Sequence, residues 1–315
     1  MGLFANFAIV KNTFMKRIFI VFAIAVFTAV CVNAQLLYRI SGNGLEKPSY
    51  VVGTYHLAPA SFVDSIPGAR EALASVEQVC GELDMRDVQS PDSLAKLTEA
   101  MRLPGGKYLK DVLGEEEMAK LNGYMMTVMG VNFTNPMVES QLGRLSPAAI
   151  QNQLQLLQYI KLTPGFNPAA LVDVYFQTEA AKAGKPVIGF ETMDMQIAVL
   201  YKGVPLERQK ELLMCMIDNQ EYTIQQMRGI ADAYFAQDME RLVEVADESV
   251  GNNCDSTPEE KDALIYDRNA DWAGKFPAIA GEKATLFVVG ALHLPGERGL
   301  LQLLKNSGYI VDGLK

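Results

Sequence analysis

The two histidines of this chain lie in nearly identical local sequences, one near each end. The first stands in residues 51–57 (VVGTYHL) and the second in 288–294 (VVGALHL). Each segment begins with paired valines, reaches a glycine and places a histidine three residues later. A buried strand of a parallel sheet ends in this way, and open α/β sheets bind ligands at that end. A single histidine after a strand is most often structural, but the repeated sequence pattern predicts that His56 and His293 share one ion or one water.

Short apolar segments alternate with longer helical stretches along the whole chain. The expected strands cover residues 36–41, 50–52, 76–83, 185–191, 284–289 and 309–311. Helical periodicity and capping residues indicate helices over 67–75, 115–128, 147–162, 168–183, 206–236, 238–249, 258–280 and 296–306. Strands separated by helices predict an α/β fold, with a central, mostly parallel or mixed sheet flanked by helices and large helical insertions.

The N-terminal segment has the features of a targeting signal. A basic pair precedes an apolar run over residues 18–32, and small residues follow up to Ala34. This pattern predicts a signal peptide over residues 1–34, which leaves 35–315 as a single domain. A membrane anchor is the competing interpretation, but the run is short for a span and ends in a processing site. We expect no membrane span after signal removal, and a periplasmic or extracellular location.

The charge balance limits the classes of partner. The chain has a formal net charge of −9, and its signal segment is basic, so the exported part is more acidic still. An acidic exported protein is not expected to bind nucleic acid or an anionic membrane surface. A peptide or a small molecule is the expected substrate.

Three cysteines lie beyond the signal segment. Cys80 falls inside an apolar strand, where a lone cysteine behaves as a small hydrophobic residue. Cys215 and Cys254 fall in two helical stretches that reverse near Gln237, and an antiparallel pair would bring them close. Export permits a disulfide, so we predict a 215–254 bridge. No CxxC spacing is present, which argues against a structural zinc site.

Four of the expected strands end in a polar residue that can do chemistry. These residues are His56, Glu82, Glu191 and His293, and a glycine stands shortly before each of them. Two imidazoles with one or two carboxylates are suitable ligands for Zn, Mn, Co or Fe. The sequence therefore indicates one metal or catalytic site at the carboxyl edge of the sheet.

Helix capping is the competing interpretation for both carboxylates. Glu191 precedes Thr192 at a strand–helix junction, where an acidic residue often stabilises the first turn of the next helix. The same interpretation is weaker for Glu82, because Asp84 is better placed to cap the following helix.

With these residues in view, the chain resembles the TraB/PrgY/GumN family, which includes the Tiki metalloproteases, from about residue 37 to 313. The matching segments are the two GxxH motifs at 53–56 and 290–293, GELD at 81–84, LVD at 171–173, AGKPVIGFET at 183–192, DRN at 267–269 and WA at 272–273. Phe190 and Val172 depart mildly from the residues usual at those positions. Asp173 and Arg268 lie in amphipathic helices, where most charges simply face water.

The resemblance implies a metal-dependent hydrolase, with peptidase as the best-known activity. His56, Glu82 and His293 would then form the metal or catalytic centre, with a divalent ion (Mn, Co or Zn). Arg268 would stabilise an oxyanion or hold a carboxylate, and Glu191 would support the site. No HExxH or GxSxG motif is present, so an ordinary zincin and a serine hydrolase are both disfavoured.

Two other functions remain open from the sequence. The first is a metal-free, esterase-type hydrolase in which histidine and glutamate activate water directly, as implied by a likeness to erythromycin esterases. The second is a non-enzymatic exported protein that binds haem or an iron chelate in the same cleft.

Overall fold

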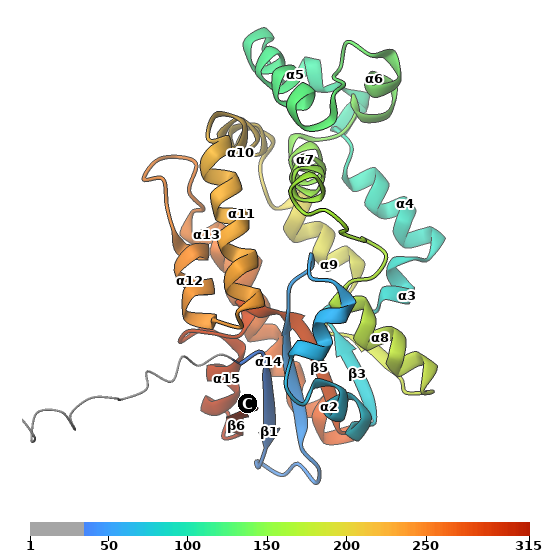
Figure 1. The fold of residues 1–315 in the computed structure, drawn as a ribbon. Helices are drawn as coiled ribbons and strands as arrows, with labels where there is room; N and C mark the ends of the chain where they lie inside the picture. Colours follow the sequence, from blue (N-terminus) through green and yellow to red (C-terminus); the bar gives the residue numbers. More distant parts are fainter. Residues whose placement is uncertain (1–34) are drawn as a thin grey trace, which may run out of the picture. The chain divides into compact units, whose positions relative to one another are not determined.

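The structure is a computed structural model that describes residues 35–315 (Figure 1). The predicted signal peptide over 1–34 lies outside the described residues. Within 35–315, no helix is both long enough and apolar enough to cross a membrane.

A six-stranded mixed sheet forms the centre, which confirms the predicted fold class. Its strands are β1 (Leu37–Ser41), β2 (Ser49–Thr54), β3 (Gln78–Gly81), β4 (Val187–Gly189), β5 (Thr285–Gly290) and β6 (Ile310–Gly313). They lie in the order β4-β3-β5-β2-β1-β6, and β4, β3, β5 and β2 are parallel neighbours. β1 runs antiparallel to both β2 and β6. Each of the six strands lies where the apolar segments predicted it.

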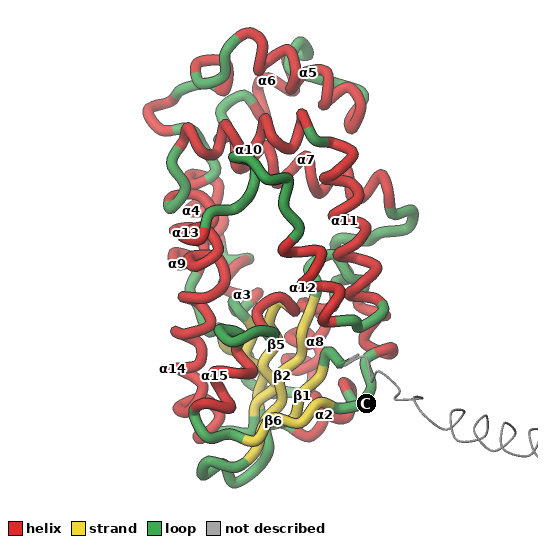
Figure 2. The backbone as a smooth tube through the Cα atoms, turned by 90° about the vertical axis from the view of Figure 1, so that its left-hand side faces the viewer, coloured by secondary structure: helices red, strands yellow, loops and turns green. Residues whose placement is uncertain are grey.

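Helices cover both faces of the sheet. Figure 2 shows α14 (Asp267–Glu282) and α15 (Leu300–Asn306) on one side of the strands, with α2 (Ala69–Ser75) and α8 (Val172–Lys182) on the other. Strands β2, β3 and β5 are accordingly buried along almost their whole length. This two-sided burial explains why the sequences of these strands are continuous apolar runs rather than alternating apolar and polar residues.

Two long insertions leave the sheet and return to it. The first, between β3 and β4, contains α3 (Met85–Val88), α4 (Pro91–Ala100), α5 (Glu115–Met129), α6 (Pro136–Leu142), α7 (Pro147–Leu162) and α8. The second, between β4 and β5, contains α9 (Met193–Ile197), η4 (Ala198–Lys202), α10 (Leu206–Asp218), α11 (Gln220–Phe235), α12 (Met239–Asp247), α13 (Pro258–Lys261), η5 (Asp262–Tyr266) and α14. Helices α5, α7 and α10 from both insertions pack around a second apolar cluster, separate from the core of the sheet.

Several helices differ from the prediction, and the one expected over 296–306 begins only at Leu300. The helix expected from residue 168 begins at Val172, because residue 171 pairs with Pro59 in an isolated bridge and the chain is still extended there. The stretch 206–236 is divided at Asn219, and 258–280 contains the π-helical turn η5. Helices α3, α4, α6 and α9 were not predicted.

The predicted disulfide is confirmed: Cys215 and Cys254 are bonded, with their Cα atoms 5.5 Å apart. Cys215 lies on α10 as expected, but Cys254 lies in the loop after α12 rather than in a helix. Cys80 is free and buried on β3, and burial raises the pKa of its thiol.

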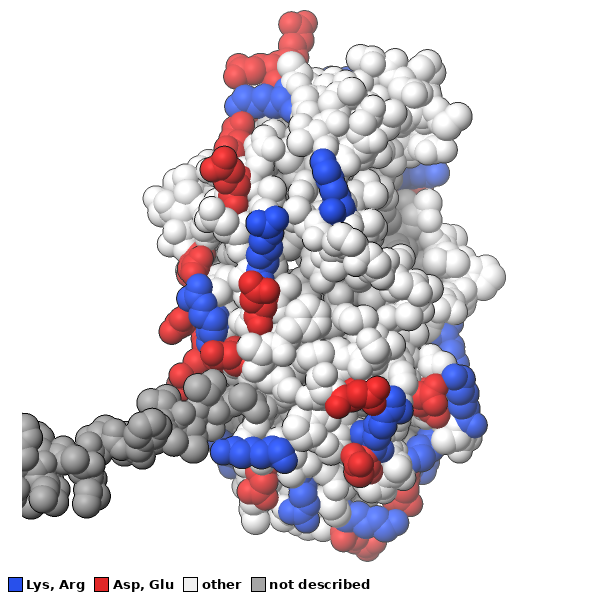
Figure 3. All heavy atoms as spheres, in the orientation of Figure 1, with Lys and Arg blue, Asp and Glu red and all other residues white. Residues whose placement is uncertain are grey.

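Charged side chains of both signs are mixed on the surface. On the face drawn in Figure 3, Lys and Arg side chains mostly stand near Asp or Glu side chains. The ion pair between Arg70 and Asp64, at 2.6 Å, is one of many such pairs.

Candidate functional site

The two histidine segments are neighbouring strands. In the parallel pairing of β2 with β5, Val52 lies opposite Val288 and Thr54 opposite Gly290. The chain after β5 folds back so closely that a Cβ on Gly53 would lie 2.8 Å from Leu294 Cδ1. The same Cβ would lie 3.1 Å from Ala291 Cα, so glycine at this position allows the close approach of the two strand ends without a shift of the neighbouring chain.

All four predicted strand-end residues follow the four parallel strands. Because β4, β3, β5 and β2 are adjacent and parallel, their carboxyl ends meet at one edge of the sheet. Glu191, Glu82, His293 and His56 follow these strands in that order. Their common location follows directly from the topology.

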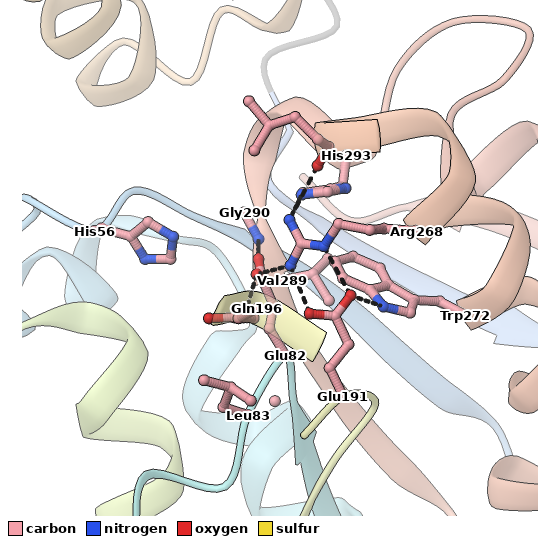
Figure 4. A network of polar contacts seen from close by, with 12 residues as sticks. His56, Glu82, Leu83, Glu191, Gln196, Arg268, Trp272, Val289, Gly290 and His293 are labelled. Carbon is pink, nitrogen blue, oxygen red and sulfur yellow. Dashed lines mark hydrogen bonds and ion pairs between the residues drawn. The ribbon is translucent and has the colours of Figure 1, made fainter. Parts of the chain in front are cut away.

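Arg268, on the first turn of α14, joins both glutamates (Figure 4). Its Nη2 donates to Glu82 Oε2 at 2.6 Å and to Glu191 Oε2 at 3.0 Å, and its Nε donates to Glu191 Oε1 at 2.7 Å. Trp272 Nε1 donates to the same Oε1 at 2.9 Å, and the guanidinium carbon lies 4.8 Å from the centre of the Trp272 ring. The three charged side chains are almost fully buried, so this network holds the guanidinium in one position.

The π-helical turn η5 gives Arg268 a further contact. Arg268 Nη1 donates to the carbonyl oxygen of Leu264 at 3.1 Å, one turn earlier in the chain. Such turns inside α-helices are rare and occur often at functional sites.

Glu82 is ionised in this setting. Burial alone would raise its pKa, but the positive charges of Arg268 and His56, together with the backbone N–H of Gly290, act against burial, and the pKa lies below its ordinary value. The backbone N–H of Gly290 donates to Glu82 Oε1 at 2.8 Å, so the end of β5 also holds this carboxylate.

His293 is buried and neutral. Its Nδ1 lies 2.7 Å from Asn269 Oδ1, while Asn269 Nδ2 donates to the carbonyl oxygen of Arg298, so Nδ1 carries the ring proton. Its unprotonated Nε2 lies 3.2 Å from Arg268 Nη1. Burial lowers the pKa of His293 to about 4.

His56 differs from His293 in exposure and charge. Its side chain is 69% exposed, and its Nδ1 lies 2.5 Å from Asp173 Oδ2 on the first turn of α8. This hydrogen bond raises the pKa of His56 to about 9. Figure 4 shows His56 across from the group around Arg268, with no contact drawn between them.

Neither glutamate caps a helix. The carboxylate of Asp84 accepts the Arg86 N–H at the start of α3, and the Thr192 hydroxyl accepts the Met195 N–H at the start of α9. The capping interpretation is therefore wrong for both Glu82 and Glu191.

Sequence reasoning missed several residues of this network. Asp173 was expected to face water, yet it orients His56. Asn269 and Trp272 contributed only to the family resemblance, yet they bind His293 and Glu191. Gln196, whose Nε2 lies 3.4 Å from Glu82 Oε2, was not predicted as a site residue. The LVD and DRN segments that contain Asp173 and Asn269 were the available signals.

A cavity of about 590 Å³ opens onto these residues. His56, Glu82, Arg268 and His293 line it, while Glu191 stands behind Arg268. The four groups that face the cavity can bind and polarise a substrate in the same space.

The imidazole nitrogens and the carboxylate oxygen that face the cavity are atom types that bind divalent metal ions. Both histidines have Nδ1 held by an oxygen acceptor, which leaves Nε2 as the ligating atom, and this is the usual arrangement of metal-bound histidines. Glu82 adds an anionic oxygen donor. The guanidinium of Arg268 would compete with an ion for Glu82 and His293, because it already contacts both. Within residues 35–315, no three His, Cys, Asp or Glu side chains lie close enough together to hold an ion.

These features define a class of α/β protein that assembles histidines, glutamates and an arginine at the carboxyl ends of four parallel strands. The chain belongs to the TraB/PrgY/gumN family, whose model matches residues 36–313. This match confirms the resemblance inferred from the motifs.

Two relatives carry the name Metalloprotease TIKI2. The chain is 22% identical over 305 residues to the one from Danio rerio, covering 84% of this chain and 58% of the relative. It is 23% identical over 306 residues to the one from Xenopus tropicalis, covering 84% and 57%. The chain thus spans somewhat more than half the length of these relatives. No solved structure matches the chain.

Proposed function

We propose that this protein is an exported hydrolase of peptide bonds that depends on a divalent metal ion. The observation that carries the proposal is the shared cavity of His56, Glu82 and His293, with Nδ1 of each imidazole tied to an oxygen acceptor. The similarity to two relatives named Metalloprotease TIKI2 supports metalloprotease chemistry.

In this proposal, His56 Nε2, His293 Nε2 and a Glu82 oxygen hold the ion, which is Mn, Co or Zn. When bound, such an ion lowers the pKa of a water molecule toward neutrality and polarises the carbonyl of the bond to be cleaved. Asp173 and Asn269 orient the two imidazoles for this purpose.

Arg268 supplies positive charge to the substrate. A guanidinium fixed by Glu191 stabilises the negative charge that develops on a carbonyl oxygen, or holds a substrate carboxylate. Glu191 and Trp272 act as positioning residues, because both contact the arginine and neither lines the cavity.

Export is supported by two features. The pattern over residues 1–34 is that of a signal peptide, and the Cys215–Cys254 bridge is the kind of bond that persists in oxidising compartments.

The test is cleavage of a peptide library by purified protein, with elemental analysis of the same sample. We expect activity with Mn²⁺ or Co²⁺, loss of it after chelation and recovery on adding the metal back. His293→Asn should lose both activity and bound metal. Glu179→Gln, an exposed substitution on α8, serves as the control and should retain both. Chelated protein with undiminished activity would refute metal dependence.

A metal-free hydrolase is the second candidate, and one observation favours it. The Arg268 guanidinium already provides a cation beside Glu82 and His293, at 2.6 and 3.2 Å. Full hydrolytic activity at zero metal occupancy would select this candidate.

A further inference from the structure

We propose that the cavity binds a large apolar side chain of the peptide substrate, next to the bond that is cleaved. This inference rests on the proposed function and adds the substrate preference. Away from the polar groups, the cavity walls are formed largely by aliphatic side chains, among them Val199, Leu200, Ile230, Leu242, Leu264 and Ile265.

The charged groups of the cavity are already engaged with one another. Glu82 is paired with Arg268, and Asp173 is paired with His56. Together with His293, which is neutral, these residues are the only acidic and basic side chains lining the cavity in the part of the chain that the structure describes. Asp173 Oδ1 is buried without a partner, but it belongs to the carboxylate that His56 already holds. A lysine or glutamate side chain among the aliphatic residues would lose its hydration without a charged partner beside it, which is costly. An apolar side chain would gain by leaving water.

The aliphatic wall is built beside the reacting groups. The two π-helical turns η4 and η5 pack against each other, and they carry Leu200 and Leu264. The carbonyl oxygen of Leu264 also holds Arg268 Nη1. The same turn therefore places an apolar surface and the guanidinium next to each other, which puts the bound side chain close to the bond that Arg268 serves.

Leu200 and Leu264 are 41% and 43% exposed, although both are large and apolar. Their accessibility leaves them free to contact a ligand, and it makes Leu200 suitable for substitution because little core packing depends on it. Leu94 on α4 is a matched control: it is 48% exposed and lies outside the cavity lining.

The experiment has two arms, and both use the full chain loaded with Mn²⁺ or Co²⁺. In the first, a peptide library is digested and the residues flanking each cleavage are read by mass spectrometry. We expect leucine or phenylalanine over alanine at one flanking position by about tenfold or more, as apolar pockets discriminate. Leu200→Lys should abolish that preference and favour aspartate or glutamate there, while Leu94→Lys should leave it unchanged.

The second arm separates this inference from the proposed function. Binding of a blocked leucine-rich peptide, a matched lysine-rich peptide and a fatty acid is measured by calorimetry. Tight binding of the leucine-rich peptide, weakened at least tenfold by Leu200→Lys but not by Leu94→Lys, supports the inference even where no peptide is cleaved. In that case only the proposed function fails. Equal binding of both peptides, preferential binding of the fatty acid, or cleavage without an apolar preference would overturn the inference.

Discussion

Replacing Glu191 with glutamine should destabilise the protein by about 2–3 kcal/mol. The Glu191 carboxylate is 2% exposed and accepts hydrogen bonds from Arg268 at 2.7 and 3.0 Å and from Trp272 at 2.9 Å. Glutamine keeps one acceptor oxygen but turns an N–H₂ group toward a guanidinium N–H. At least one charge-assisted bond is lost, and such bonds contribute about 1.5–3 kcal/mol each.

The magnitude is bounded from above by the remaining partner of the arginine. Removing one member of a buried ion pair costs about 3–5 kcal/mol when the other charge is left alone. Arg268 keeps Glu82 at 2.6 Å, so the loss should stay at or below the lower end of that range. For a chain of this size, the corresponding fall in Tm is about 3–5 °C.

The assay is thermal and urea unfolding followed by circular dichroism, with wild type and two variants in parallel. Glu179→Gln is the control, since Glu179 is an exposed residue paired with Lys182 at 2.7 Å and such pairs contribute at most about 1 kcal/mol. If Glu191→Gln loses no more stability than Glu179→Gln, then the buried network does not hold the site in the way described.

Three other changes have clear expected results. Glu82→Gln should keep the fold and lower hydrolysis by about two to four orders of magnitude, and a parallel loss of bound metal would identify this residue as a ligand. Reducing the Cys215–Cys254 bridge, which links residues 39 positions apart, should cost about 3–4 kcal/mol in urea unfolding, and thiol titration of unreduced residues 35–315 should find one free thiol. The hydrogen bond from Arg208 lowers the pKa of Glu260 below its ordinary value of 4.5. The ionised Glu260 therefore stabilises the fold above pH 4.5, and this stabilisation is lost as the pH falls through the lowered pKa. Glu260→Gln should flatten the acid side of a plot of unfolding free energy against pH, and an unchanged slope would contradict this assignment.

The sheet could be predicted from sequence because its strands are short, apolar and buried on both faces. The same reasoning placed His56, Glu82, Glu191 and His293 at one edge, since the carboxyl ends of parallel strands must meet there. The helices were harder to predict. α4 carries no buried residue and so shows no apolar face, although Ser90 before a proline is a clear helix start.

The hydrogen-bond partners of the site residues could not be predicted from the pattern of apolar and polar residues. Asp173, Asn269 and Trp272 lie on helices, and their polar groups meet the histidines and Glu191 only through the packing of α8 and α14 on opposite faces of the sheet. Local periodicity gives no information on such contacts. The disulfide was predicted correctly, although one premise of the prediction was wrong: Cys254 lies in a loop rather than on a helix.

The two histidine segments begin alike and end differently, and this difference sets the chemistry of the site. Side by side in β2 and β5, their backbones are held in one register. After Gly290 the chain turns at once into a short 3-10 helix, which buries His293 against Asn269 and keeps it neutral. After Gly53 the strand continues to Thr54, and His56 lies in the turn that Ala58 N–H closes onto the Tyr55 carbonyl oxygen; there it stays exposed, and the hydrogen bond to Asp173 raises its pKa. One imidazole is thus a fixed, unprotonated nitrogen donor, and the other is an accessible imidazole, held by a carboxylate, that must release a proton before its Nε2 can bind an ion. The two roles require different surroundings, which explains how a repeated sequence can build a site whose two halves are not equivalent.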